Sequence, residues 1–575
     1  MRWWTGAIGA AALALLAACN SESGTGPNGG LDPCPDGADA ELVSLPVGGV
    51  RVVDGAALRC VAVSPDGGGD GTFLLVAANA DPKPDQTMQF VMADSSGPLA
   101  AVVRAPSFDA GRAGGSPLAR ALARPADGAA EGRLRAMERR VLARAIGTGA
   151  MAPALAAARA RATSAAALPA LGDTMSFRVP DPNADDACAT FSTERAVVKA
   201  IGRHGIILQD VNAPANGFTA SDFSGIVQEF DDEIYPADTA HFGSPSDVDA
   251  NDHVFLLFTP KVNAATKRSS EGILEGFFFG GDLAPTSVCA ESNLSEVFYL
   301  LVPDPTGQFS DVRTTADVRQ GTRGIIAHEF QHMINDGVRI ARDAPPESVW
   351  LNEALSHFAE ELVGRAEHGF GDLRELGIND VADAQNDFAD FNAFFGQNLV
   401  RYRGWLQDPA TLGATSEHAD TSLAVRGAAW SLVRWSADHF SGGDVAGFTR
   451  ALVAGPDTSV ANLVARAGAP FDTLMAGWLV ASFADDNGIG GLPARDQFAS
   501  WNIHEVESAV NSGVFPLEPI TLGAAAPQAR SVSSAAAVYF LVTVNAGTER
   551  VVGELAPDGS PLNEPGARLY VLRVR

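Results

Sequence analysis

The feature that most constrains the fold is a pair of histidines four residues apart, His328 and His332, within GTRGIIAHEFQHMINDG. On an α-helix, residues i and i+4 share one face, so both imidazoles can reach one zinc ion. Apolar residues on both sides of the pair indicate a helix buried in a core, with its polar residues turned to a cleft. Buried histidines need polar partners, and zinc is one. Two surface histidines are the alternative interpretation of the pair taken alone.

Glu329 follows the first histidine and lies about a hundred degrees around the helix from it. Its carboxylate can approach the open position of a metal ion without occupying it, and can take a proton from water there. Zinc would lower the pKa of that water toward about 7 and polarise a scissile carbonyl. Glu329 would then deliver the proton to the leaving amine, so the pattern predicts metal-assisted hydrolysis.

A catalytic zinc site has three protein ligands, so a third ligand must exist. The extended metzincin motif would place Gly at position 335 and His at position 338. The chain has Asn335 and Val338 there, which excludes that class. Further along, ESVWLNEALSHFAEEL has apolar residues at helical spacing and predicts a second buried helix, which carries Glu353.

An HExxH motif followed by an Asn-Glu-Ala helix resembles the gluzincins, the thermolysin-like class whose third ligand is that glutamate. The resemblance implies that Glu353 is the third zinc ligand. Within the class, HEFQHMI and WLNEALS together are similar to the hyicolysin family of bacterial metallopeptidases. That similarity covers roughly residues 172–440, including DVDANDHVFLLFTPKVN, GFFFGGDL and FYLLVPDP. It implies one zinc ion, hydrolysis of protein or peptide substrates, and export.

One position departs from the thermolysin-like pattern. There, an Asp four residues after the third ligand accepts a hydrogen bond from the first zinc histidine, whereas this chain has His357. Glu360, Asp336 or a backbone carbonyl could supply the missing acceptor. His357 could also compete as a ligand, because it shares a helix face with Glu353.

Two further groups of polar residues are candidates with weaker support. A donor from the later helices should stabilise the oxyanion. The candidates are Tyr402, His418, Arg426 and His439, each of which could instead be structural. Calcium is suggested by DVDANDH, with Asp247, Asp249 and Asn251 at alternate positions. The segment is not an EF-hand, because position six is Asp252 and position twelve is not Glu, so an ordinary polar turn is favoured.

The N-terminus reads MRWWTGAIGAAALALLAAC, an apolar run of signal-peptide length that ends in small residues. Its last four residues resemble the bacterial lipobox, which predicts a signal peptide over 1–18 and lipidation of Cys19. Asn20 after the cysteine is similar to an outer-membrane sorting signal in a two-membrane bacterium. Ordinary cleavage near Ala18 is the alternative. We therefore expect a protein exported to the cell envelope and anchored by lipid.

Changes in composition along the chain predict several domains and linkers. A Gly/Ser/Asn/Pro-rich tether is followed by short apolar runs between turn clusters, then by an Ala/Arg-rich helical stretch. That stretch is interpreted as a connector, with an inhibitory or cleavable pro-segment as the alternative. The fold class predicted is α+β, a zincin-like domain with a sheet-bearing lobe and a helical lobe between small all-β domains. The parts are a tether (19–40), a β-domain (41–110), a helical connector (111–171), a metallopeptidase domain (172–515) and a C-terminal β-domain (516–575).

Four cysteines remain after Cys19, an even number in an exported chain where disulfides persist. Three pairings are open. We favour Cys34 with Cys60 and Cys188 with Cys289, because each pair stays within one predicted domain. None of the four has the close CxxC spacing of a cysteine metal site.

The formal net charge of −28 argues against a nucleic-acid partner, because such proteins need basic surface. Two other functions stay open. The chain could be a binding or adhesion lipoprotein whose peptidase domain is inactive, although retention of both histidines and both glutamates speaks against decay. It could also be a zinc hydrolase that acts on a non-protein amide.

Overall fold

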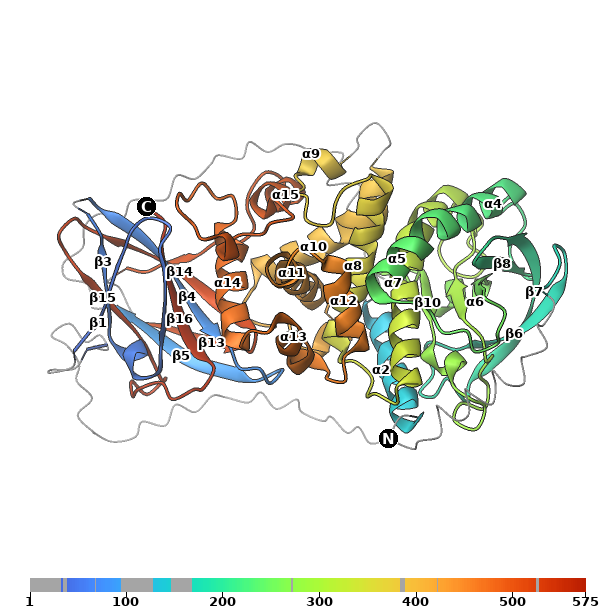
Figure 1. Ribbon diagram of the computed structural model, residues 1–575, viewed down its shortest axis with the longest axis horizontal. Helices are drawn as coiled ribbons and strands as arrows, with labels where there is room; N and C mark the ends of the chain where they lie inside the picture. The colour runs from blue at the N-terminus through green and yellow to red at the C-terminus, as the bar shows by residue number, and fades with distance from the viewer. Residues whose placement is uncertain are drawn as a thin grey trace, which may run out of the picture.

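The computed structural model describes residues 33–34, 39–67, 69–94, 128–145, 168–269, 272–382, 388–420, 422–523 and 527–575. The predicted signal segment, Cys19 and most of the predicted tether lie outside these residues. The molecule is elongated, with a β-sandwich at one end, helices in the middle and a sheet-bearing lobe at the other end (Figure 1). This mixture of helices and sheets confirms the predicted α+β class. The described residues contain no helix long and apolar enough to cross a membrane.

A six-stranded mixed sheet forms the core of the sheet-bearing lobe, in the order β10-β11-β9-β8-β7-β6. Its inner strands β8, β9 and β11 are parallel, and the outer pairings are antiparallel. Every residue of β9 and β11 is buried, as expected for strands covered on both faces. The strands are β6 (Thr174–Pro180), β7 (Phe191–Ile201), β8 (Gly205–Asp210), β9 (Val254–Phe258), β10 (Gly276–Phe278) and β11 (Val297–Leu300).

Within the sheet-bearing lobe the sequence predicts two helices, TERAVVKAIG and SDFSGIVQEFDDEI, and strand β7 corrects the first of these predictions. Its burial alternates, with Glu194, Ala196, Val198 and Ala200 on the buried side. That period of two is the pattern of a strand, and pairing with β6 and β8 overrides the weak helical pattern. The helix predicted next along the chain is present as α4 (Ala220–Glu229), which continues through a π-helical turn into α5 (Tyr235–Phe242).

Two long helices, α7 (Thr315–Ala341) and α8 (Val349–Glu367), pack against each other beside the sheet (Figure 1). Helix α7 begins at a capping box, in which Thr314 Oγ1 accepts from the backbone N–H of Asp317 and Asp317 accepts from the backbone N–H of Thr314. Both helices are buried along most of their length. They are the two helices that the sequence predicted to carry the zinc ligands.

The central helical region packs around aromatic side chains. Trp405, Trp430, Trp435, Trp478 and Trp501 are all almost completely buried there. This agrees with the predicted helical lobe and supplies the rigid backing for α8. Its helices are α9 (Ile378–Val381), α10 (Gly396–Gln407), α11 (Leu423–Phe440), α12 (Val445–Ala454), α13 (Ser459–Ala467), α14 (Phe471–Ala484) and α15 (Ile503–Val510).

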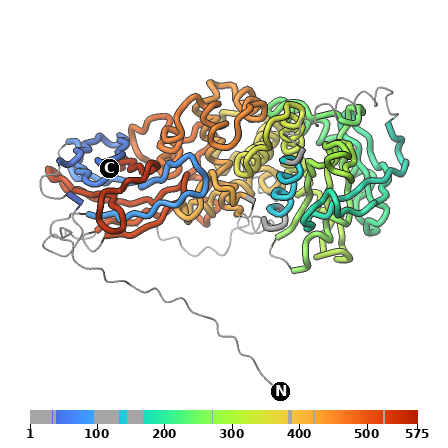
Figure 2. The backbone as a smooth tube through the Cα atoms, turned by 90° about the horizontal axis from the view of Figure 1, so that it is seen from below, coloured from blue at the N-terminus to red at the C-terminus, as the bar shows by residue number. Residues whose placement is uncertain are grey.

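The β-sandwich differs from the two separate β-domains expected at 41–110 and 516–575. Strands from both segments share two five-stranded sheets, β1-β3-β15-β5-β13 and β12-β14-β4-β16-β2. Figure 2 shows the early and late strands running side by side. The first segment supplies β1 (Glu41–Leu45), β2 (Val50–Asp54), β3 (Val61–Pro65), β4 (Gly71–Asn79) and β5 (Thr87–Asp94). The second supplies β12 (Ile520–Thr521), β13 (Gln528–Ser533), β14 (Ala536–Val544), β15 (Arg550–Leu555) and β16 (Ala567–Arg573).

This interleaving has a physical cause. Central strand β4 pairs with β14 on one side and β16 on the other, and both partners come from the C-terminal segment. Either segment alone would leave long, apolar strand edges unpaired. The two segments therefore form one unit with a shared core between the sheets.

Two disulfides join the pairs that the sequence analysis favoured, Cys34 with Cys60 and Cys188 with Cys289. Helix α6 (Pro260–Ala265) directly follows β9 in the sheet-bearing lobe. Helix α2 (Gly128–Ala145) stands between β5 and β6 in the chain. It belongs to neither the sandwich nor the sheet. It lies beside α7 in Figures 1 and 2.

Candidate metal centre

The ring nitrogens of the two motif histidines face each other inside the molecule. His328 Nε2 and His332 Nε2 are 3.2 Å apart. Glu353, on α8, places its carboxylate oxygens 3.5 Å from His328 Nε2 and 3.8 Å from His332 Nε2. Within the part of the chain that the structure describes, the two oxygens make ion pairs with buried arginines but no hydrogen bond. Three buried side chains therefore bring their ligand groups together.

These separations suit a tetrahedral zinc ion. Bonds of about 2.0–2.2 Å at tetrahedral angles place ligand atoms roughly 3.3–3.6 Å from one another. Two imidazole nitrogens at hydrogen-bond distance also cannot both donate, whereas both can coordinate a cation. His328, His332 and Glu353 therefore fit a zinc ion, which would supply Lewis-acid activation of water and carbonyl.

The opposite ring nitrogen of each histidine has its own acceptor. His328 Nδ1 lies 2.7 Å from Glu360 Oε1 and donates to it. His332 Nδ1 lies 3.0 Å from Ser356 Oγ, which itself donates to Gln331. In the neutral ring, both contacts place the proton on Nδ1 and leave a lone pair on Nε2. This is the tautomer that a metal ligand needs. Glu360 is therefore the hydrogen-bond acceptor for His328. The sequence had left Glu360, Asp336 and a backbone carbonyl as candidates for this contact.

Electrostatics set the protonation of these groups. Burial would lower the pKa of His328, but hydrogen bonds to Glu353 and Glu360 raise it to about 9, so a bound cation would displace a proton from this ring. Burial and the positive charge of Arg135 lower the pKa of His332 well below its usual value, so its ring is neutral. Burial would raise the pKa of Glu360, but His357 and His328 lower it to about 2. Burial would also raise the pKa of Glu353, but Arg426 and the histidines hold it well below its usual value. Both carboxyls are therefore ionised.

His357 is the alternative ligand that the sequence raised, and its atoms are close. His328, Glu353 and His357 offer ligand atoms within 4.8 Å of one another. However, Arg401 Nη1 lies 2.6 Å from His357 Nε2. Burial and that guanidinium lower the pKa of His357 to about 3, so Nε2 accepts from Arg401. Its lone pair is therefore engaged, which favours His332 over His357.

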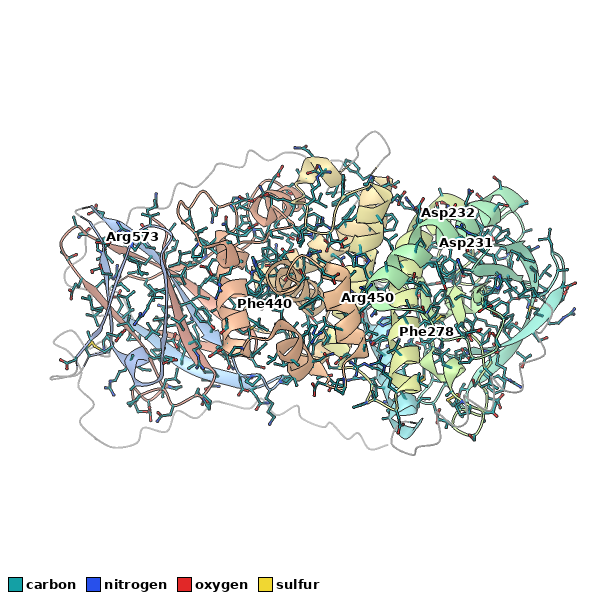
Figure 3. All side chains as sticks on the ribbon, viewed as in Figure 1. Asp231, Asp232, Phe278, Phe440, Arg450 and Arg573 are labelled. Atoms are coloured by element: carbon teal, nitrogen blue, oxygen red, sulfur yellow. A yellow bond between two sulfur atoms is a disulfide. The ribbon has the colours of Figure 1, made fainter. Side chains whose placement is uncertain are left out.

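Glu329 lies at the edge of the same cluster, on α7. Its Oε2 accepts from the backbone N–H of Phe278 at the end of β10, at 2.9 Å. Figure 3 labels Phe278 beside α7. The backbone of the sheet thus holds the carboxylate next to the ligands, where a general base is expected. The same oxygen also accepts from Arg135 Nη2 at 2.7 Å.

The other predicted site residues are spread over the molecule. Arg426 reaches the centre, with Nη1 2.9 Å from Glu353 Oε2. Tyr402 points into the helical core and donates to Ser482. His439 bonds the backbone of Gln497, and His418 lies exposed at residues 417–420, which pack on α2. Of the four oxyanion candidates, the structure brings only Arg426 against a ligand.

Asp336 lies one turn beyond His332 and lines a cavity with α2 rather than contacting His328. Burial raises its pKa to about 7. In the other predicted cluster, Asp247 and Asp249 meet Glu296, with ligand atoms within 4.8 Å. Asn251 donates to both aspartates, through its backbone to Asp247 and its side chain to Asp249, as in the polar turn that the sequence favoured.

Arg135 is a site residue that the sequence analysis missed. It stands on α2 among several other arginines, so its type carried no signal. Its position did carry one, because Arg135 and Glu138 are about one helical turn apart and border the apolar residues Leu134, Met137, Val141 and Leu142. A charged pair beside an apolar stripe indicates that the helix packs against a surface with charged side chains of its own.

A search of curated proteins finds the neutral metalloprotease ShpI of Staphylococcus hyicus, 31% identical to this chain over 150 residues. The match covers 26% of this chain and 32% of ShpI, so the chain spans about a third of that relative's length. No family model matches the chain.

Proposed function

We propose that this protein is a zinc metallopeptidase of the hyicolysin-like gluzincin type. The part-length similarity to a protein named a neutral metalloprotease supports a metal-dependent peptidase in general. The observation that carries the finer proposal is that three buried side chains bring their ligand groups together, with His328 and His332 Nε2 3.2 Å apart beside the Glu353 carboxylate.

The roles follow from the contacts. His328, His332 and Glu353 would hold zinc, which supplies activation of water and of the scissile carbonyl. Glu329 accepts the proton of the attacking water and passes it to the leaving amine. The Phe278 backbone N–H fixes the orientation of the Glu329 carboxylate, since its 2.9 Å hydrogen bond leaves little freedom of rotation. Protein or peptide chains are the proposed substrates.

Export and lipid attachment at Cys19 are part of the same proposal. Two features support them: the apolar N-terminal segment that ends at a lipobox-like cysteine, and two disulfides, which persist in oxidising compartments. Labelling with a radioactive fatty acid tests the attachment. Cys19→Ser should abolish the label, and a label that survives this change would contradict the proposal.

The test of the peptidase proposal measures zinc and catalysis on the same samples. The chain from residue 20 onward is compared with Glu329→Gln, His332→Ala and the exposed control Glu549→Gln, using zinc mass spectrometry and casein cleavage. We expect one zinc in all but His332→Ala, and cleavage only by the unmodified chain and the control. Equal zinc content in His332→Ala and the unmodified chain would contradict the assignment of the centre.

A further inference from the structure

Helix α2 places a cation inside the candidate active site. Arg135 is 4% exposed, and its guanidinium contacts carboxylates from two other helices. Nη2 lies 2.7 Å from Glu329 Oε2, and Nε lies 3.3 Å from Glu353 Oε1. One side chain thus engages both the proposed general base and a proposed metal ligand.

This contact conflicts with the chemistry proposed for the site. Glu329 Oε2 already accepts two hydrogen bonds, from Arg135 and from the backbone of Phe278. A substrate carbonyl and an attacking water need the space beside Glu329 and Glu353 that the guanidinium fills. A cation there also opposes a second cation bound to Glu353.

The rest of α2 is docked as a unit over the cleft. Leu134, Met137, Val141 and Leu142 are all buried on its inner face. Polar contacts add to this docking: Glu138 accepts from Gly280 N–H at 3.3 Å, and Arg139 pairs with Glu417 at 2.9 Å. A cavity beside the site is lined by α2 on one side and by Asp336, Asn352 and Glu353 on the other. The helix therefore forms a wall of the cleft.

The helix is separable from the fold that holds the site. It supplies no strand to any sheet, and it stands in the chain between the sandwich and the sheet-bearing lobe. Arg135 also pairs with Glu138 of its own helix, at 2.8 Å. If α2 leaves the cleft, Glu138 moves with Arg135, so the guanidinium keeps a carboxylate partner.

We propose that α2 is an intramolecular inhibitory helix, and that Arg135 blocks the candidate active site by holding Glu329 and Glu353 until the helix leaves the cleft. The inference rests on the proposed peptidase function. The sequence allowed two interpretations of residues 111–171, a connector or an inhibitory segment. The proposal favours the inhibitory segment.

The first test uses the chain from residue 20 onward with Arg135→Ala. A matched control is Arg133→Ala, since Arg133 is exposed on the same helix and bonds only Asn183 in the part of the chain that the structure describes. If about one molecule in ten is open before the change, Arg135→Ala raises kcat/KM for a fluorogenic peptide about tenfold. Arg133→Ala leaves it unchanged. Equal rates for all three proteins would overturn the inhibitory role.

A second measurement does not depend on turnover or on a variant that folds well. Hydrogen–deuterium exchange is followed in the zinc-loaded, unmodified chain with and without a peptide hydroxamate, a probe that binds active-site zinc. The probe and Arg135 compete for one space, so the amides of 128–145 should exchange at least about tenfold faster when the probe is bound. The amides of α14, which carries no residue of the proposed site, should not change. Bound probe with unchanged exchange over 128–145 would overturn the proposal.

The two tests also separate this inference from the peptidase proposal. Zinc and probe binding that release α2, without peptide cleavage by Arg135→Ala, would support the inhibitory docking and contradict the peptidase function. Cleavage at the same rate by the unmodified chain and Arg135→Ala would support the peptidase and contradict the inhibitory helix.

Discussion

Glu360 Oε1 lies 2.7 Å from His328 Nδ1 and only 2.9 Å from His357 Nδ1, so one carboxylate oxygen orients two buried imidazoles. In a thermolysin-like pattern the acceptor for the first zinc histidine would stand at position 357. Here it stands three residues later on α8, and the histidine at 357 has become its neighbour. Glu360 thus stands about one helical turn beyond position 357 and makes the contact to His328.

This relationship predicts the effect of Glu360→Gln. The neutral amide is a weaker acceptor for His328 Nδ1, so the ring is less basic and less firmly oriented. Loss of such an outer contact costs about 10–100-fold in metal affinity or activity. Zinc affinity, measured by competition with a chromogenic chelator, should fall by that factor. Glu367→Gln, on the same helix but paired with Arg323, is the control. An unchanged affinity for Glu360→Gln would show that the contact is incidental.

The shared sandwich predicts what a C-terminal truncation does. Strand β15 lies between β3 and β5, and β4 lies between β14 and β16. Removing residues 516–575 would take central partners out of both sheets. Amide exchange over 71–79 should then become fast, whereas β8 and β9 in the other lobe keep slow exchange. Protected amides over 71–79 in the truncated chain would instead indicate an independent N-terminal domain.

Local sequence signals placed the proposed metal ligands on two buried helices, whereas they gave no indication of pairings between distant segments. His328, His332 and Glu353 lie on two helices whose apolar spacing fixes which face is buried, so motif and fold support each other. The pairing of β4 with β14 depends on strands separated by most of the chain, and no local pattern encodes it. Arg135 belongs to the same category, because its role depends on Glu329 and Glu353, which come much later in the sequence.

The buried Asp485 predicts a pH dependence of stability. Its carboxyl accepts from the backbone N–H groups of Phe498 and Ile503, yet burial raises its pKa from 3.8 to about 8. The folded state therefore holds this proton up to about pH 8, while the unfolded state releases it near pH 4. Stability is greatest below pH 4 for this group and falls as pH rises to 8, by up to about 1.4 kcal/mol per pH unit.

Asp485→Asn removes this proton linkage while keeping a carbonyl oxygen as acceptor. Urea midpoints at pH 5.5, 6.5 and 7.5 should therefore fall less steeply with pH in Asp485→Asn than in the unmodified chain. Asp408→Asn, at an exposed position, should reproduce the slope of the unmodified chain. Parallel slopes for all three proteins would show that Asp485 is already ionised in the folded state.

Metal removal should destabilise the lobe that holds the ligands. A cation that binds only the folded state stabilises it by about 2.7 kcal/mol when present at a hundred times its Kd. Chelation should therefore lower the Tm of the unmodified chain by about 5 °C or more. Zinc should restore the Tm and magnesium should not, because two of the three ligand atoms are imidazole nitrogens. In Glu353→Gln the shift should be much smaller, since a neutral amide replaces the charged ligand.

The contact between α2 and Glu353 predicts a second difference in the effect of chelation. Arg135 supplies positive charge to Glu353 when no metal is bound, so Arg135→Ala should lose more Tm on chelation than the unmodified chain does. Differential scanning calorimetry checks both differences. A Tm that chelation leaves unchanged in every protein would contradict a structural coupling between the metal centre and the fold.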